Sequence, residues 1–181
     1  MPVFIAMLRA VNVGGHNMIK MEALRALCES LDLQKAQTYV QSGNVVFKTS
    51  RRDAAGVAKL LEDTIEMTFG FRPVVIVRTP GEVREVIARN PFANRPEIEP
   101  NKLLVNFLAR DPGAEGRKKM LGIKTDPEEV RIGGRELYIY FRDGVGRSKL
   151  SPAVMEKALG TPGTARNWNS VMKLLEMAEK L

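Results

Sequence analysis

The chain has 181 residues, of which 44% are hydrophobic and one is cysteine, and its formal net charge is +7. This length suits one domain or two small ones with a buried core, and the apolar content excludes a disordered chain. No apolar run reaches the roughly 18 residues of a membrane span, and the single cysteine excludes an internal disulfide. We therefore expect a basic cytoplasmic protein without a membrane partner.

The first half of the chain predicts the order strand, helix, strand, strand, helix, strand. A nearly continuous apolar run over residues 3–11 is typical of a buried central strand. The turn pair Ser42-Gly43 indicates a hairpin. This order is the ferredoxin-like βαββαβ arrangement. The predicted elements are strand 3–11, helix 20–31, strands 38–41 and 44–48, helix 53–69 and strand 72–78.

The second half predicts a similar element order, after a short helix and a linker with three prolines. Residues 161–170 are expected to be a loop, with Asn169 or Ser170 as the N-cap of the last helix. We predict an α+β fold: a ferredoxin-like subdomain, 1–79, and a second α+β subdomain, 80–181, packed as one compact unit. The predicted elements are helix 80–89, linker 90–101, strand 102–108, helix 113–121, strands 130–132 and 136–141, helix 152–159 and helix 170–181.

The excess positive charge lies in two separate segments. Residues 1–52 hold seven basic and three acidic side chains, and residues 142–173 hold six and two, so each segment has a net charge of +4. Residues 53–141 are neutral. Such a charge distribution is informative about binding partners and not about the fold. The alternative explanation is that the charges only keep the protein soluble.

Four polar loop segments coincide with these charges or lie beside them. The first, RAVNVGGHNMIK over residues 9–20, leaves a strand, turns through Gly14-Gly15 and enters a helix. Backbone N–H groups of a glycine loop can bind an anion, and a helix N-terminus adds positive potential. A tight turn that needs positive φ explains the glycines equally well. The loop matches no nucleotide-binding pattern.

The other three segments carry further donors. QSGN over 41–44 is a turn that could lie beside another loop, and GVGRSKLS over 144–151 presents two cations and a hydroxyl before a helix. TPGTARNWNS over 161–170 holds Arg166, Asn167 and the single tryptophan, Trp168. A buried anchor is the favoured interpretation of Trp168, and a stacking platform the alternative.

Several kinds of chemistry lack the residues that they need. His16 is the sole histidine and no His/Cys cluster exists, so we expect no zinc site. The four segments hold almost no carboxylates, which gives no support to bound magnesium or paired-carboxylate catalysis; we expect no cofactor. Cys28 lies on the apolar face of a helix, as expected of an inert thiol. His16 is the one obvious general base if the protein is an enzyme, and the sequence leaves open whether it is.

The same segments resemble the uncharacterised bacterial family called domain of unknown function 1697. The resemblance covers nearly the whole chain and is clearest in LRAVNVGGHNMIKMEALRALCESL (8–31), TYVQSGNVVF (38–47), GRSKLS (146–151) and TARNWNSVMKL (164–174). The family pattern usually reads LRGINVGG with a proline before the helix, whereas this chain has Ala10 and Lys20 at those places. The resemblance implies an α+β fold with a ferredoxin-like part. It implies no activity, substrate or catalytic residue.

We expect the chain to bind a phosphate-bearing or other anionic ligand in a basic cleft between its two halves, because ligands favour such places. Nucleic-acid binding through a basic surface is an alternative, although aromatic residues are only 6%. A protein-interaction module without catalysis is another. The candidate ligand-binding residues are Arg9, Asn12, Gly14, Gly15, His16, Asn17, Ser42, Asn44, Arg147, Ser148, Lys149, Arg166 and Asn167.

Overall fold

The computed structural model describes residues 1–181 and has six α-helices and two four-stranded antiparallel sheets, which confirms the predicted α+β class. The chain groups into two compact units: residues 1–85 with 172–181, here called unit 1, and residues 86–171, here called unit 2. The sequence did not predict that the C-terminal residues group with the first half. The subdomain boundary at residue 79 stays a prediction. None of the helices is long and apolar enough to cross a membrane.

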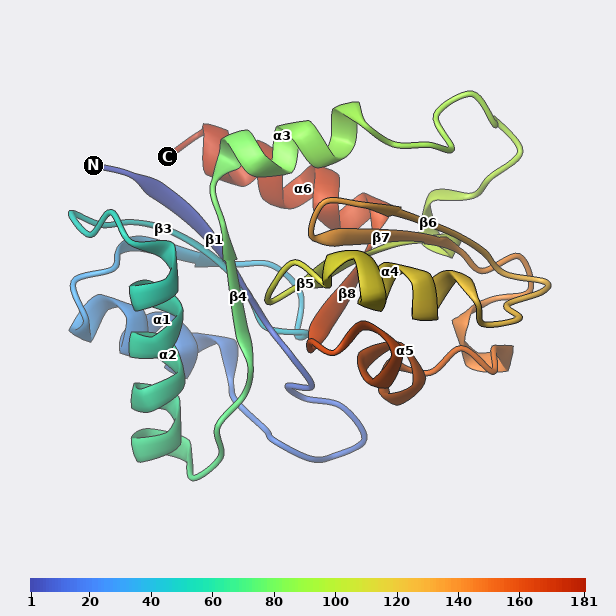
Figure 1. Cartoon of the computed structure of the whole chain (residues 1–181). Coiled ribbons are helices and arrows are strands. Elements are labelled where there is room, and N and C mark those ends of the chain that lie inside the picture. The colour runs from blue at the N-terminus through green and yellow to red at the C-terminus, as the bar shows by residue number, and fades with distance from the viewer. The chain divides into compact units, whose positions relative to one another are not determined.

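Unit 1 is built on a sheet with the strand order β2-β3-β1-β4, in which all neighbours are antiparallel. Figure 1 shows α1 and α2 on the same side of this sheet, in blue to green. The elements are β1 (Val3–Leu8), α1 (Met21–Ser30), β2 (Gln34–Thr38), β3 (Asn44–Lys48), α2 (Ala54–Phe69) and β4 (Val75–Arg78).

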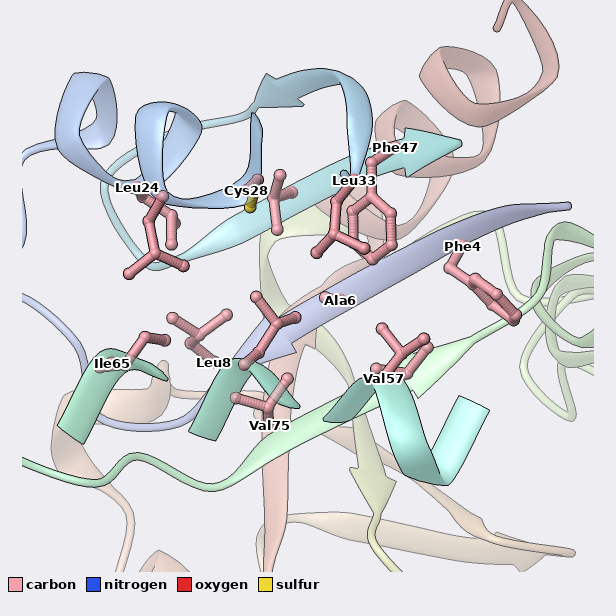
Figure 2. Packing of buried hydrophobic residues seen from close by; sticks show 14 of the residues in the cluster. Phe4, Ala6, Leu8, Leu24, Cys28, Leu33, Phe47, Val57, Ile65 and Val75 are labelled. Atoms are coloured by element: carbon pink, nitrogen blue, oxygen red, sulfur yellow. The ribbon is translucent and has the colours of Figure 1, made fainter. Parts of the chain in front are cut away.

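The central strand β1 is apolar on both faces. Ala6 and Leu8 belong to the core that they share with Leu24 of α1 and Ile65 of α2, and Figure 2 shows these side chains converging. Ile5, which alternates with them, is fully buried as well. Because both faces are buried, the strand reads as a continuous apolar run instead of an alternating one.

Unit 2 has the same order of strands and helices, and its sheet has the corresponding strand order β6-β7-β5-β8. Its core includes Leu137 of β7 together with Met120, Met155 and Leu159 from two helices. Helices α3 (Pro80–Ala88) and α6 (Trp168–Glu179) each contribute residues to both units. The remaining elements are η1 (Pro100–Lys102), β5 (Leu103–Leu108), α4 (Gly113–Leu121), β6 (Glu129–Gly133), β7 (Glu136–Tyr140), η2 (Val145–Arg147), α5 (Pro152–Leu159) and β8 (Gly163–Asn167).

The prediction of a loop over residues 161–170 is wrong, because this stretch contains β8. The strand pairs with β5, where Leu104 lies opposite Asn167 and Val105 opposite Arg166. Its buried side chains are Thr164 and Arg166, so the buried face is polar. Since strand prediction relies on alternating apolar residues, GTARN gives no strand signal.

The strand predicted over residues 38–41 is also misplaced. β2 is Gln34–Thr38, an edge strand with an irregular register against β3, and residues 40–43 form the connection that follows it. The sequence QKAQT is polar because an edge strand is hydrogen-bonded on one side only and most of its side chains remain accessible. The hairpin that joins β2 to β3 is confirmed.

Candidate functional site

The Gly14-Gly15 pair forms the turn of a small hairpin. Val13 and His16 face each other in an isolated β-bridge, and the His16 N–H donates a 3.0 Å hydrogen bond to the Val13 carbonyl. Gly14 and Gly15 have φ of 58° and 76°, as a type I′ turn requires. A Cβ added at Gly15 would meet no atom within 4 Å. The turn conformation therefore accounts for both glycines.

The glycine turn does not open a helix, which corrects the expectation from the sequence. Helix α1 begins at Met21, and Lys20 before it is extended, with φ −67° and ψ 137°. The potential of a helix N-terminus falls off within the first turn, so α1 adds little at Gly14 and Gly15. The turn remains exposed, and so does His16 at its end.

Asn12 joins the first segment to the second. Its Nδ2 donates to the carbonyls of Ile19 (2.9 Å) and Gln41 (2.7 Å), and its Oδ1 accepts from the Ile19 N–H (2.8 Å). The prediction that the 41–44 turn lies beside another loop is therefore confirmed. Both donors of this amide are used inside the protein, as is the Nδ2 of Asn17, which donates to the Ala10 carbonyl over 3.3 Å.

The turn before β3 is held by Asn44 and Gly43. Asn44 is fully buried, and its Nδ2 donates to the Tyr39 carbonyl (3.0 Å) and to Ser42 Oγ (2.9 Å). The Gly43 carbonyl accepts from the Leu8 N–H over 2.8 Å. Gly43 has φ 83°, and a Cβ at this position would lie 2.9 Å from the Leu8 Cβ. Asn44 and Gly43 thus have clear structural roles.

The third segment lines a cavity of about 290 Å³ in unit 2, here called the η2 cavity. Arg147 and Lys149 line it, together with Lys124, which sequence reasoning did not single out. Ile123, Leu150 and Val154 give it an apolar part. Two of the predicted residues therefore line one concave surface.

Local hydrogen bonds shape the segment between η2 and α5, which lines the η2 cavity. Ser148 Oγ accepts from the Leu150 N–H over 3.0 Å, so this hydroxyl fixes the bend after η2. Ser151 caps α5 through a 3.2 Å bond from the Val154 N–H, as predicted. These contacts leave the long side chains of Arg147 and Lys149 exposed toward solvent and the cavity.

The η2 cavity is also lined by Asp126 and Glu128, which the sequence analysis missed. They lie in a turn closed by two hydrogen bonds, from the Glu128 N–H to the Thr125 carbonyl (2.9 Å) and from Thr125 Oγ1 to the Glu128 carbonyl (3.1 Å). Glu128 is only 5% exposed. The signal that could have indicated this turn is the Asp126-Pro127 pair between a helix and a strand.

Arg166 and Asn167 serve the structure of β8 and α6. Arg166 is 7% exposed, donates to Thr164 Oγ1 over 2.6 Å, and has its pKa lowered to about 10 by burial. Asn167 Oδ1 accepts from the Ser170 N–H over 2.9 Å and is therefore the N-cap of α6, which corrects the assignment of Asn169 or Ser170. Trp168 is the first helical residue and is half-buried.

No group of three or more His, Cys, Asp or Glu side chains is placed to hold a metal ion. Cys28 lies on α1 and is fully buried in the core, and burial raises the pKa of its thiol to about 12. The thiol therefore stays protonated at neutral pH, as expected of an inert core residue.

Comparisons with known proteins identify a family but no activity. The family model described as "Protein of unknown function (DUF1697)" matches residues 1–138. A solved structure described as conserved bacterial protein SP0830 from Streptococcus pneumoniae is similar, with a TM-score of 0.71 and 20% sequence identity over 98% of each chain. At that identity the likeness shows the fold alone. A search of the curated proteins finds no match.

Proposed function

The chain belongs to the DUF1697 family, whose function is unknown. From the geometry of the chain itself we propose that it binds a phosphate-bearing or other anionic small molecule. The observation that carries the proposal is the η2 cavity, where Arg147 and Lys149 line a concave surface beside Lys124. Arg binds phosphate or carboxylate through paired hydrogen bonds, and Lys acts as a point charge.

The size and the lining of the η2 cavity support a small ligand. Its volume of about 290 Å³ is at the lower end of the range of roughly 300–1,000 Å³ that is typical of ligand pockets. Ile123, Leu150 and Val154 provide apolar contact next to the cations. A concave site of this size suits a small anion better than a nucleic-acid backbone, which needs an extended basic track.

The exposed turn of unit 1 is retained in the proposal as a second set of anion contacts. Gly14, Gly15 and His16 lie at the tip of the hairpin and are exposed. The proposal also keeps Arg9, Ser42, Arg166 and the candidate asparagines as ligand residues. The contacts described above for Arg166 and the asparagines are internal to the protein. The η2 cavity is the stronger candidate because its cations line a concave surface.

We also infer that unit 1 is ferredoxin-like. The strand order β2-β3-β1-β4, with α1 and α2 in the two connections on one side of the sheet, supports this class. Unit 2 has the corresponding order, which supports the same class for the second subdomain. A cytoplasmic location remains part of the proposal and is supported by the single buried cysteine.

Calorimetry and thermal unfolding at low salt test the proposed function. The probes are inorganic phosphate, tripolyphosphate and a set of nucleotides and sugar phosphates. A probe present at 100 times its Kd stabilises the folded chain by about 2.7 kcal/mol, which raises the Tm of a chain of this size by roughly 5–10 °C.

Matched variants locate the binding. Arg147→Ala and Lys149→Ala should each weaken the best probe about tenfold or more, since each removes a charged hydrogen-bond donor. Arg142→Ala is the control: Arg142 is exposed in the same basic segment but does not line the cavity. If no anion stabilises the protein at low salt, or if all three variants bind the probe equally, the proposal is wrong.

A further inference from the structure

A second cavity of unit 2 lies at the edge of its sheet and is here called the β6 cavity. β6 is the first strand in the order β6-β7-β5-β8, so no further strand covers its outer side. The cavity has a volume of about 410 Å³, within the range of roughly 300–1,000 Å³ that is typical of ligand pockets. Its lining comes from β6, from α4 and from the residues that follow α3, and it shares no residue with the η2 cavity.

The charged side chains that line the β6 cavity are all arginines: Arg89, Arg117 and Arg131. The lining includes no carboxylate. Two carboxylates lie next to it, since Asp111 accepts from Arg117 and Glu129 Oε1 is 4.0 Å from Arg131 Nη2. The charged groups that a ligand would meet inside the cavity are therefore cationic.

Arg117 is held in place and still has donors to offer. Its Nη2 donates to both carboxylate oxygens of Asp111 (3.0 Å each) and to the Gly134 carbonyl (2.8 Å). All three contacts use the same nitrogen, so Nη1 and Nε are the donors that a ligand can use. A guanidinium that is already positioned loses less conformational freedom when it binds an anion.

Arg131 is positioned in a comparable way. Its guanidinium lies 5.5 Å from the centre of the Phe92 ring, and its Nη1 donates to the Val130 carbonyl over 3.0 Å. Stacking on an aromatic ring leaves the edge of a guanidinium accessible to an anion. Two arginines with defined positions thus contribute to one concave surface.

The rest of the β6 cavity is largely apolar. Leu121, at the end of α4, is 63% exposed and lines it together with the half-buried Ile132. Tyr138 contributes an aromatic ring, because its hydroxyl already donates to the Val86 carbonyl over 2.6 Å. A ligand that covers Leu121 removes apolar surface from water, which favours binding.

We propose that the β6 cavity binds an amphipathic organic acid, whose carboxylate is held by the arginines of the cavity and whose hydrocarbon part lies on Leu121 and Ile132. The three guanidinium groups account for the acid, and the apolar lining accounts for the hydrocarbon. This inference goes beyond the proposed function, because it concerns a different cavity and a ligand with an apolar body.

A series of straight-chain carboxylates from acetate to octanoate tests the inference on the unmodified protein. Each acid is compared by calorimetry at low salt with the primary alcohol of the same length. We expect the affinity of the acids to rise about three- to fourfold per methylene group until the cavity is filled. Each longer alcohol should bind about tenfold or more weakly than its acid, since it lacks the charged hydrogen bonds. Absence of binding by every acid, or equal binding of acids and alcohols, would overturn the inference.

Variants of the arginines locate the acid group. Arg89→Met and Arg131→Met keep the aliphatic stem and remove the charge, so each should weaken octanoate about tenfold. Arg142→Met is the control, because Arg142 is exposed and does not line the cavity. Equal affinity of all three variants would show that octanoate binds elsewhere.

Leu121→Gln separates the apolar contact from the charge. It should weaken octanoate severalfold and leave propanoate unchanged, because only the longer chain is expected to reach this side chain. Leu121 is exposed, so its replacement leaves the core intact. Met67→Gln on α2 is the matched control, since Met67 is also exposed but lies outside the cavity.

The outcomes distinguish this inference from the proposed function. If Arg147→Ala weakens octanoate and Arg89→Met does not, the acid binds in the η2 cavity, and the β6 site is wrong while the proposed function is supported. If phosphates bind through Arg147 and no carboxylate of any length binds, the proposed function holds and this inference fails. If octanoate responds to Arg89→Met and Leu121→Gln while no small anion binds, the β6 site holds and the proposed function fails.

Discussion

The Nδ2 of Asn12 donates a 2.7 Å hydrogen bond to the backbone carbonyl of Gln41, across 29 residues of chain. The same amide exchanges two hydrogen bonds with the backbone of Ile19. One side chain therefore holds the glycine hairpin against the turn before β3. Asn12 adopts φ 57°, a left-handed conformation that asparagine tolerates better than most residues.

Replacing Asn12 by Ala should detach these two loops. The change removes two donors and one acceptor and places alanine in the left-handed region, so we expect a loss of about 2–4 kcal/mol in the free energy of unfolding. Urea denaturation measures the loss. Amide hydrogen exchange should be faster at Ile19, whose N–H would have lost its acceptor.

Asn17→Ala is the control for Asn12→Ala. Asn17 is exposed, and its Nδ2 makes one hydrogen bond of 3.3 Å, to the Ala10 carbonyl. Its loss should cost less than that of Asn12, although Asn17 also has a positive φ, 52°. Equal stability of the two variants would contradict the role assigned to Asn12.

Gly43 and Gly15 form a second matched pair. Both have positive φ, 83° and 76°, but a Cβ at Gly43 would lie 2.9 Å from the Leu8 Cβ, whereas a Cβ at Gly15 meets open space. Gly15→Ala should cost about 1–2 kcal/mol through its backbone conformation alone. Gly43→Ala should cost about 1–3 kcal/mol more, because the methyl group collides with a packed strand. Chemical denaturation of both variants gives the difference, and equal losses would show that the close approach to Leu8 is unimportant.

The sequence predicts those helices and strands best that bury an apolar face, because burial produces a periodic apolar pattern. The apolar run at β1 and the periodic apolar residues of α2 predicted the bounds of these two elements to within a few residues, because each element buries an apolar face in the core. β8 was missed because its buried side chains, Thr164 and Arg166, are polar. A polar residue that is buried against a specific partner looks like a loop residue in one sequence.

The candidate site shows the same limit. Arg147 and Lys149 were identified because charged residues next to glycines indicate an exposed loop. This signal is local in the sequence. Asp126 and Glu128 were not identified, because nothing near them in the sequence distinguishes carboxylates that line a cavity from the many that do not. That they line the same cavity as Arg147 depends on how the turn after α4 and the segment around η2 fold in unit 2, which is long-range information.

Asn167 can be tested as a helix cap. Its Oδ1 accepts from the Ser170 N–H, which would otherwise have no partner at the start of α6. Asn167→Ala should therefore lower the free energy of unfolding by about 1 kcal/mol, while Asn167→Asp keeps the acceptor and should retain the stability. Thermal unfolding of the two variants decides. If the two variants lose stability equally, the Nδ2 group of Asn167 contributes the stabilisation and helix capping is not the main role of this residue.

An exposed ion network between α2 and Arg72, which follows this helix, predicts a dependence of stability on pH. Asp63 accepts from Lys59 Nζ (2.6 Å) and from Arg72 Nη1 (2.5 Å), and these two cations lower the pKa of its carboxyl below the ordinary 3.8. A carboxyl whose pKa is lower in the folded state stabilises fully above its unfolded pKa, and the stabilisation is lost as pH falls through the folded pKa. Asp63→Asn should therefore be less stable than the parent at pH 7, and the difference should shrink as pH falls below about 3.8.

Urea midpoints of the parent and of Asp63→Asn, measured between pH 7 and pH 2, test this dependence because the other titrating groups cancel in the difference. The stability difference should also decrease in 1 M salt, where the Debye length is about 3 Å, since Asp63 and Arg72 are both accessible to solvent. Glu115→Asn is the control: Glu115 is 82% exposed beside Lys119 on α4, so its removal should change little at any pH. A difference for Asp63→Asn that stays constant from pH 7 to pH 2 would show that the carboxyl stabilises the fold by its shape, not by its charge.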